Sequence, residues 1–135
     1  MNPIVKNILA VVAGFIGGSI VNMGLVMAGS TVIPPPAGVN VMDAESIKAS
    51  MHLYKAHHFI TPFVAHALGT LVGAYLAGRI GATHKMKLAL GIGALFFIGG
   101  IWAASMIPAP TWFVVLDLVG AYIPMGWLGG KLADK

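Results

Sequence analysis

The sequence contains no cysteine and few charged residues. The absence of cysteine among its 135 residues excludes disulfide bonds, thiolate metal sites and cysteine nucleophiles. Charged residues make up only 9% of the chain, whereas soluble domains contain about 25%. So few charges cannot cover the surface of a globular domain, and 58% of the residues are hydrophobic. The composition therefore predicts a protein whose outer surface faces the lipid bilayer.

Acidic residues and enzyme motifs are also scarce. The chain has 4 acidic and 8 basic residues, which gives a net charge of +4. The basic residues lie in short clusters between apolar runs, a pattern typical of membrane topology, so no nucleic-acid partner is expected. No glycine-rich phosphate loop follows a strand, and no serine nucleophile elbow is present. We therefore expect neither an enzyme nor a cofactor.

Four apolar runs are each long enough to cross a bilayer, which takes about 20 residues of helix. They do not alternate as strands would, and spanning barrels need at least about eight strands. The sequence predicts an all-α integral membrane four-helix bundle, folded as a single membrane domain over residues 1–135. The predicted spans are residues 7–30, 61–80, 86–107 and 111–130, with an outer loop at 31–60.

Prolines mark the ends of two predicted spans and a kink in a third. Thr61 is a suitable helix cap, with Pro62 in the first turn, where no amide donor is needed. The third span stops at the prolines of residues 108–110. Pro124 leaves the carbonyl of Gly120 without its helical donor, so we expect a kink in the fourth span.

The basic residues gather at one set of span ends. The positive-inside rule therefore places the N-terminus, the 79–87 loop and the C-terminus in the cytoplasm. The 31–60 loop and the 108–110 turn then face outward. The basic residues on the cytoplasmic side are Lys6, Arg79, Lys85, Lys87, Lys131 and Lys135, against Lys48 and Lys55 outside.

The outer loop is predicted to contain one short amphipathic helix. Three prolines at 34–36 give a stiff start, and Asp43 can cap a helix that runs to about His58. Such a helix lies on the membrane surface or covers the outer ends of the spans, although an apolar stripe usually only packs. One face of it carries Ile47, Met51, Tyr54 and His58, and another carries Lys48, His52 and Lys55.

Two short motifs occur twice in the same order. Phe15–Gly18 recurs as Phe97–Gly100, and Leu71–Tyr75 recurs as Leu118–Tyr122. This pattern favours two duplicated helical hairpins related by a pseudo-twofold axis along the membrane normal, as in some transporters. Chance matching in a sequence of restricted alphabet is the alternative.

Small residues recur every four positions in the first two spans. Such stripes let helix backbones approach closely, and packing drives helix association in lipid. The stripes predict tight contact within the chain or between copies, so the expected partners besides the lipid bilayer are a homo-oligomer or another membrane protein. The helix-packing candidates are Gly14, Gly18, Gly69 and Gly73.

Four polar residues form a predicted intramembrane site: His66, Asp117, Asn22 and Thr70. Asp117 lies about 9 Å and His66 about 7.5 Å inside the membrane, at roughly 1.5 Å per helical residue. A charge in lipid costs at least about 2.5–3.5 kcal/mol, so Asp117 should face the bundle and pair with His66 or, failing that, with Asn22. Such a pair serves either as a proton relay or ion site reached from outside, or only to fix helix register.

Three histidines of the outer loop, His52, His57 and His58, are the candidates for a metal site. His57 and His58 are adjacent, so on a helix they point about 100° apart and chelate poorly. The spacing matches no helical metal motif. The alternative is that these side chains are interfacial and titrate near neutral pH.

Several stretches resemble an uncharacterised family of small four-helix bacterial inner-membrane proteins. They are Ile33–Gly38, Ser50–Leu53, Pro62–Gly69 and Tyr122–Gly130. The resemblance covers most of the chain. It implies the bacterial inner (plasma) membrane and supplies no activity. The chain does not resemble small multidrug transporters, which carry a glutamate in the first span where this sequence has Asn22.

Two functions are compatible with these features. The first is a small integral membrane protein that acts by interaction or oligomeric assembly. The alternative is a small transporter or channel with a proton- or ion-linked polar site in the outer half of the membrane, built on His66, Asp117 and Asn22. A metal-dependent membrane enzyme is disfavoured because no catalytic constellation is complete.

Overall fold

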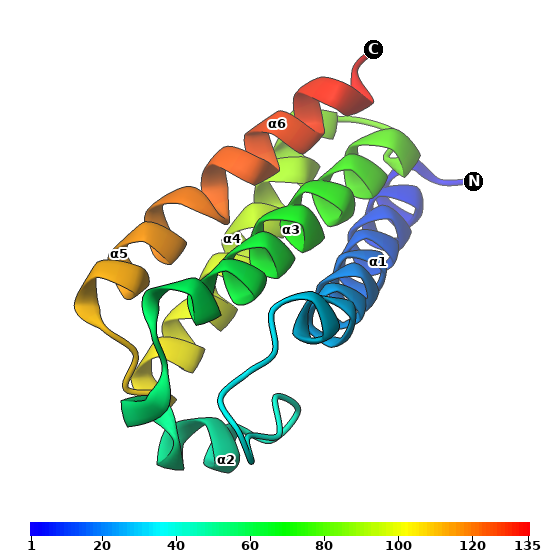
Figure 1. Ribbon diagram of the computed structural model, residues 1–135. Helices are drawn as coiled ribbons and strands as arrows, with labels where there is room; N and C mark the ends of the chain where they lie inside the picture. The colour runs from blue at the N-terminus through cyan, green and yellow to red at the C-terminus, as the bar shows by residue number, and fades with distance from the viewer.

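The computed structural model describes residues 1–135, and its regular secondary structure is entirely helical. Four of the helices are long and apolar enough to cross a membrane, if α5 and α6 are taken as one interrupted span. Figure 1 shows these helices side by side as a bundle, with both termini at one end. The predicted all-helical membrane bundle is therefore confirmed in its coarse form. The helices are α1 (Pro3–Val32), α3 (Ile60–Ile80), α4 (Lys85–Met106), α5 (Thr111–Gly120) and α6 (Ile123–Ala133).

Helix α3 is the centre of the bundle and packs against α1, α4 and α6. Its buried residues are alanines and glycines apart from one threonine, Thr70. Small side chains let the neighbouring backbones come close, which is how helices gain packing energy in lipid. The inner core is correspondingly small, with Ile92 of α4 as its one bulky member among Ala74, Ala77 and Ala89.

The contact between α1 and α3 is made by glycines. A Cβ added to Gly14 would lie 2.5 Å from the carbonyl oxygen of Gly73, and one on Gly18 would lie 2.6 Å from that of Gly69. Cβ atoms added to Gly69 and Gly73 would lie 2.9 Å and 2.6 Å from carbonyl oxygens of α1. The structure thus brings the four helix-packing candidates together within one chain.

The fourth span is broken at Ala121 and Tyr122. Helix α5 ends at Gly120, and α6 starts at Ile123, after these two intervening residues, with Pro124 in its first turn. Proline has no amide hydrogen to donate to the carbonyl of Gly120, so the helical hydrogen bonds are interrupted here. The kink expected from Pro124 is present as an interruption of the helix.

The start of α3 differs by one residue from the prediction. The helix begins at Ile60 and follows directly on a 3-10 turn, and Phe59 occupies the cap position without a side-chain hydrogen bond. Thr61 is therefore not the cap. Its side chain lies against Gly29 of α1 instead, so the residue serves in helix packing.

The single amphipathic helix predicted from Asp43 to His58 is wrong in its length. Asp43 does cap helix α2 (Ala44–Ala49), its carboxylate accepting from the Glu45 amide at 3.1 Å. The chain then forms two 3-10 turns, η1 (Met51–Leu53) and η2 (Ala56–Phe59), with extended backbone between them. The Lys55 amide donates to the His58 ring at 2.8 Å. This local bond replaces a helical one and so competes with the helix.

The proposed duplication stays a prediction. A twofold axis relating two hairpins would turn the α3–α4 contact into an equivalent α1–α6 contact. Helices α1 and α6 are not among the pairs that pack, because α3 lies between them (Figure 1). The interruption of the fourth span has no counterpart in α3, its expected equivalent.

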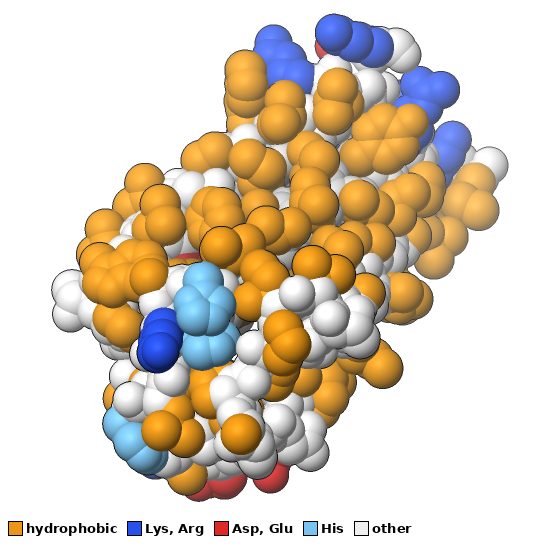
Figure 2. Space-filling model, viewed as in Figure 1, with side chains coloured by type: hydrophobic (Ala, Val, Ile, Leu, Met, Phe, Trp, Pro, Cys, Tyr) orange, Lys and Arg blue, Asp and Glu red, His pale blue; other side chains and the backbone are white.

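Charge is distributed unevenly along the bundle. Figure 2 shows basic side chains gathered at the end where the termini lie, an apolar middle, and histidines near the other end. We call the end with the termini the basic end and the end with the histidines the loop end. This is the asymmetry from which the sequence predicts cytoplasmic termini.

A large side chain placed in the contact between α1 and α3 should destabilise the protein. We expect Gly73→Leu to lower the free energy of unfolding by about 1–3 kcal/mol or more, because the new side chain meets the backbone of Gly14, which cannot move aside. The matched control is Gly24→Leu on the exposed side of α1, where an added Cβ meets nothing within 4 Å. Unfolding in mixed micelles with increasing SDS measures both. Equal stability of the two variants would contradict the role given to this contact.

Candidate functional site

His66 of α3 and Asp117 of α5 form a side-chain pair inside the bundle. Nδ1 of the histidine lies 2.8 Å from Oδ1 of the aspartate. The Asp117 side chain is only 8% exposed and that of His66 28% exposed. The structure therefore joins the two residues that the sequence places at one depth, and Asp117 faces the bundle and not the lipid.

Tyr122 is the third member of this site and is absent from the sequence prediction. Its hydroxyl donates to the second carboxylate oxygen of Asp117 at 3.1 Å, and its ring stacks on that of His66 with centroids 5.9 Å apart. Five residues along an unbroken helix correspond to a rotation of about 140°, which would point Tyr122 away from Asp117. The interruption of the span at Ala121 and Tyr122 removes that constraint.

Thr70 and Asn22 lie near the pair but do not bind Asp117. The Thr70 hydroxyl donates to the backbone carbonyl of His66 at 2.8 Å. The amide oxygen of Asn22 is buried and has no hydrogen-bond partner. Asn22 is thus not the partner of the carboxylate, and its oxygen is available to a donor from outside the protein.

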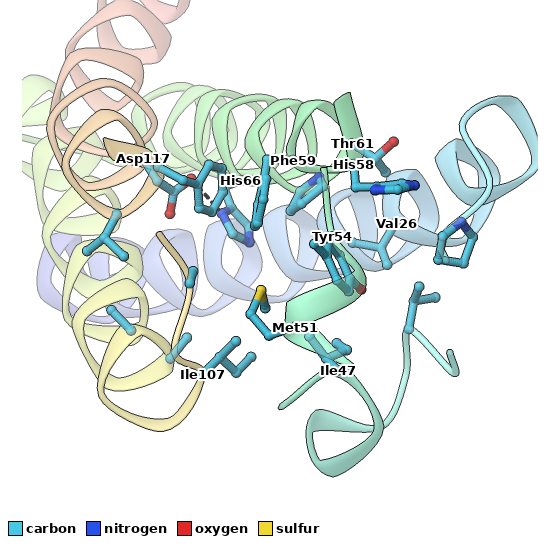
Figure 3. A pocket seen from close by; sticks show the side chains of 18 of the residues that line it. Val26, Ile47, Met51, Tyr54, His58, Phe59, Thr61, His66, Ile107 and Asp117 are labelled. Atoms are coloured by element: carbon cyan, nitrogen blue, oxygen red, sulfur yellow. Dashed lines mark hydrogen bonds and ion pairs between the residues drawn. The ribbon is translucent and has the colours of Figure 1, made fainter. Parts of the chain in front are cut away.

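A cavity of about 230 Å³ extends from the outer loop to the His66–Asp117 pair. Hydrophobic side chains supply 14 of its 22 lining residues. Figure 3 shows His66 and Asp117 on one side of this cavity, with the side chains of the loop on another. Although the predicted helix is interrupted, all four residues assigned to its apolar face line this one cavity, namely Ile47, Met51, Tyr54 and His58.

Aromatic side chains line the cavity near the outer loop. The buried ring of Phe59 packs on Phe113 with centroids 4.6 Å apart and on Trp112 at 5.6 Å. The ring centroid of Tyr54 lies 5.5 Å from the ring centroids of both His58 and Phe59. Burial raises the pKa of Tyr54 above its ordinary value, so this phenol stays neutral and can act as a hydrogen-bond donor.

A second cavity of about 220 Å³ lies on the other side of His66. It lies between α1, α3 and α4, beside the interruption of the fourth span, and its lining includes Asn22, Thr70, Gly99 and Tyr122. His66 lines both cavities, whereas Asp117 lines only the first. The imidazole ring therefore stands between an apolar chamber and a more polar one.

The loop histidines do not form a metal centre. No group of three or more His, Cys, Asp or Glu side chains is close enough to hold a metal ion. The rings of His57 and His58 lie 4.1 Å apart, and Nδ1 of His58 already accepts from the Lys55 amide. His52 is exposed on η1. These candidates therefore gain no support as metal ligands.

The His66–Asp117 pair has the form of a carboxylate that orients a histidine, as in a catalytic triad, but no serine or cysteine is hydrogen-bonded to the histidine. A carboxylate bonded to one ring nitrogen fixes the orientation and tautomer of a histidine. The His66 side chain has no serine or threonine hydroxyl as a partner, and its hydrogen bond is to Asp117. The site can therefore exchange a proton or accept a hydrogen bond.

Comparison with protein-family models, curated proteins and solved structures gives no match to this chain. The resemblance to small bacterial inner-membrane proteins, and the location that it implies, stay predictions.

Proposed function

We propose that this protein binds a small amphiphilic molecule in the outer half of the membrane and acts as a small transporter or binding protein for it. The observation that carries the proposal is the mainly apolar cavity that ends on the His66–Asp117 pair. A pair that only fixed helix register would be packed on all sides. Here the pair borders open space that reaches the outer loop.

The size of the cavity supports an occupant. An unfilled space of about 230 Å³ leaves its apolar lining without packing contacts that an occupant would supply. Pockets for drug-sized ligands measure about 300–1,000 Å³ and often lie between the helices of bundles. The expected ligand is therefore smaller than a drug, with an apolar body for the walls and one polar group for the pair.

The cavity ends at the pair in this conformation. Toward the basic end, α1, α3 and α4 close on one another through Gly14, Gly73 and Ile92. Transport therefore requires a second conformation in which His66 and Asp117 face the other side of the membrane. Binding alone requires none.

The outward direction of the cavity depends on the predicted orientation. Because the chain lacks cysteine, single cysteines give a clean test. We expect a membrane-impermeant maleimide to label Ala37→Cys in the exposed outer loop, and not Lys135→Cys, in spheroplasts of a bacterial host. Labelling of both in lysed membranes is the control. The reverse pattern in spheroplasts would place the cavity on the cytoplasmic side.

Filling the cavity should abolish binding. The probe is an eight-carbon alcohol that carries a photoactivatable diazirine, offered to the protein in lipid nanodiscs. We expect labelling of residues 41–58 and 100–107 in the wild type and at least a roughly tenfold reduction in Ala104→Trp, because Ala104 lines the cavity. The matched control is Ala94→Trp, on the exposed side of the same helix. Labelling spread evenly over lipid-facing residues, or unchanged in Ala104→Trp, would remove the proposal.

An open glycine on α4 supports assembly as a second candidate function. A Cβ added to Gly91 would meet nothing within 4 Å, and Gly91 lines neither cavity. Glycine inside a helix costs about 0.5–1 kcal/mol relative to alanine, and in membranes it is typical of sites where a second helix comes close. The face of α4 with Gly91 suits a second copy of the chain or another membrane protein.

Adding bulk to this face should reduce self-association. We expect Gly91→Leu to shift the protein toward monomer, as counted by single-molecule photobleaching in liposomes. Gly24→Leu adds the same side chain to an open position of α1 and should leave the distribution as in the wild type. Identical distributions for Gly91→Leu and the wild type would exclude assembly through this face.

A further inference from the structure

One nitrogen of the His66 ring has no partner in the protein. Nδ1 is bonded to Asp117, and the Tyr122 hydroxyl donates to the other carboxylate oxygen. When Asp117 is ionised it accepts through both oxygens, and the proton of the first bond then belongs to Nδ1. In the neutral ring Nε2 is then without a proton and is itself an acceptor.

The surroundings of this acceptor disfavour anionic head groups. No lysine or arginine lines either cavity, so an anionic group would meet Asp117 without a compensating cation, and an uncompensated charge at this depth costs at least about 2.5–3.5 kcal/mol. A cationic group would have to share the carboxylate with His66 and Tyr122, which already occupy one site on each oxygen.

The walls favour a single hydrocarbon chain. The lining between the pair and the outer loop is made of side chains such as Met51, Ile107 and Val114, all partly buried. In Figure 3, Met51 and Ile107 lie across the cavity from the labelled His66 and Asp117. A chain lying among them buries its apolar surface, which contributes about 25 cal/mol per Å².

We infer that the ligand is a neutral amphiphile with a hydroxyl group, which donates its proton to Nε2 of His66 while its hydrocarbon part lies against the apolar walls. This inference rests on the proposed function and names the ligand class of that same cavity. It predicts that recognition depends on a hydrogen-bond donor in the head group, and that neither chain length nor charge alone is sufficient.

A matched pair of probes tests the head group. The eight-carbon diazirine alcohol is compared with its methyl ether, which has the same chain and no donor. We expect the alcohol to label the cavity about threefold to tenfold more strongly, the usual contribution of one hydrogen bond. The preference should disappear in His66→Phe, which keeps a flat ring without the acceptor. It should persist in His52→Phe, the same change at an exposed loop position.

The outcomes separate this inference from the proposed function. If alcohol and ether label the cavity equally and both are lost in Ala104→Trp, the cavity binds amphiphiles and the hydroxyl inference is overturned. The hydroxyl inference is also overturned if a probe with the same chain and an amine or carboxylate head group labels the cavity more strongly than the alcohol. If neither alcohol nor ether labels the cavity, both proposals fail together.

A measurement on the unmodified chain guards against a His66 variant that does not fold. Histidine side chains labelled with ¹⁵N report the state of each ring nitrogen by NMR. We expect 1-octanol to shift the Nε2 resonance of the histidine that lies against the Tyr122 ring, and its methyl ether to leave that resonance in place. An unchanged resonance with saturating 1-octanol overturns the inference.

Discussion

The close approach of α3 to its neighbours determines the geometry of the rest of the molecule. In lipid there is little hydrophobic gain from bringing helices together, so their association depends on backbone proximity and interlocking side chains. Glycines such as Gly69 and Gly73 allow α1 to lie directly on α3, and Gly129 does the same for α6, where an added Cβ would lie 2.6 Å from the carbonyl oxygen of Leu71. With α3 fixed between them, His66 is held at a defined depth and direction.

The spans and the pairing within the site were accessible from the sequence for physical reasons. Apolar length and the distribution of lysine and arginine average over many residues, so they tolerate errors of one or two positions. Depth follows from a constant rise per residue, which is why His66 and Asp117 could be matched before their contact was seen. The cost of a charge in lipid then required Asp117 to find a partner.

Features that depend on an interruption of a helix could not be predicted from the sequence. The site contains Tyr122 only because the helix is interrupted beside Pro124, and a uniform helix gives the opposite direction for that side chain. The loop shows the same limit: its apolar stripe was recognised, but the hydrogen bond from the Lys55 amide to His58 was not, so a single helix was expected. Cavities depend on which side chains fail to fill space, and no sequence pattern encodes that.

The interruption at Ala121 and Tyr122 divides the fourth span into two parts that are held unequally. Helix α6 is clamped by Gly126 and Gly129 against α3 and α4, whereas α5 has few neighbours in the bundle. The α5 half of this span is therefore held by fewer contacts than the α6 half. Because Asp117 lies on α5 and His66 on α3, a tilt of α5 would change the separation of the carboxylate and the imidazole while the remaining bundle stays in place.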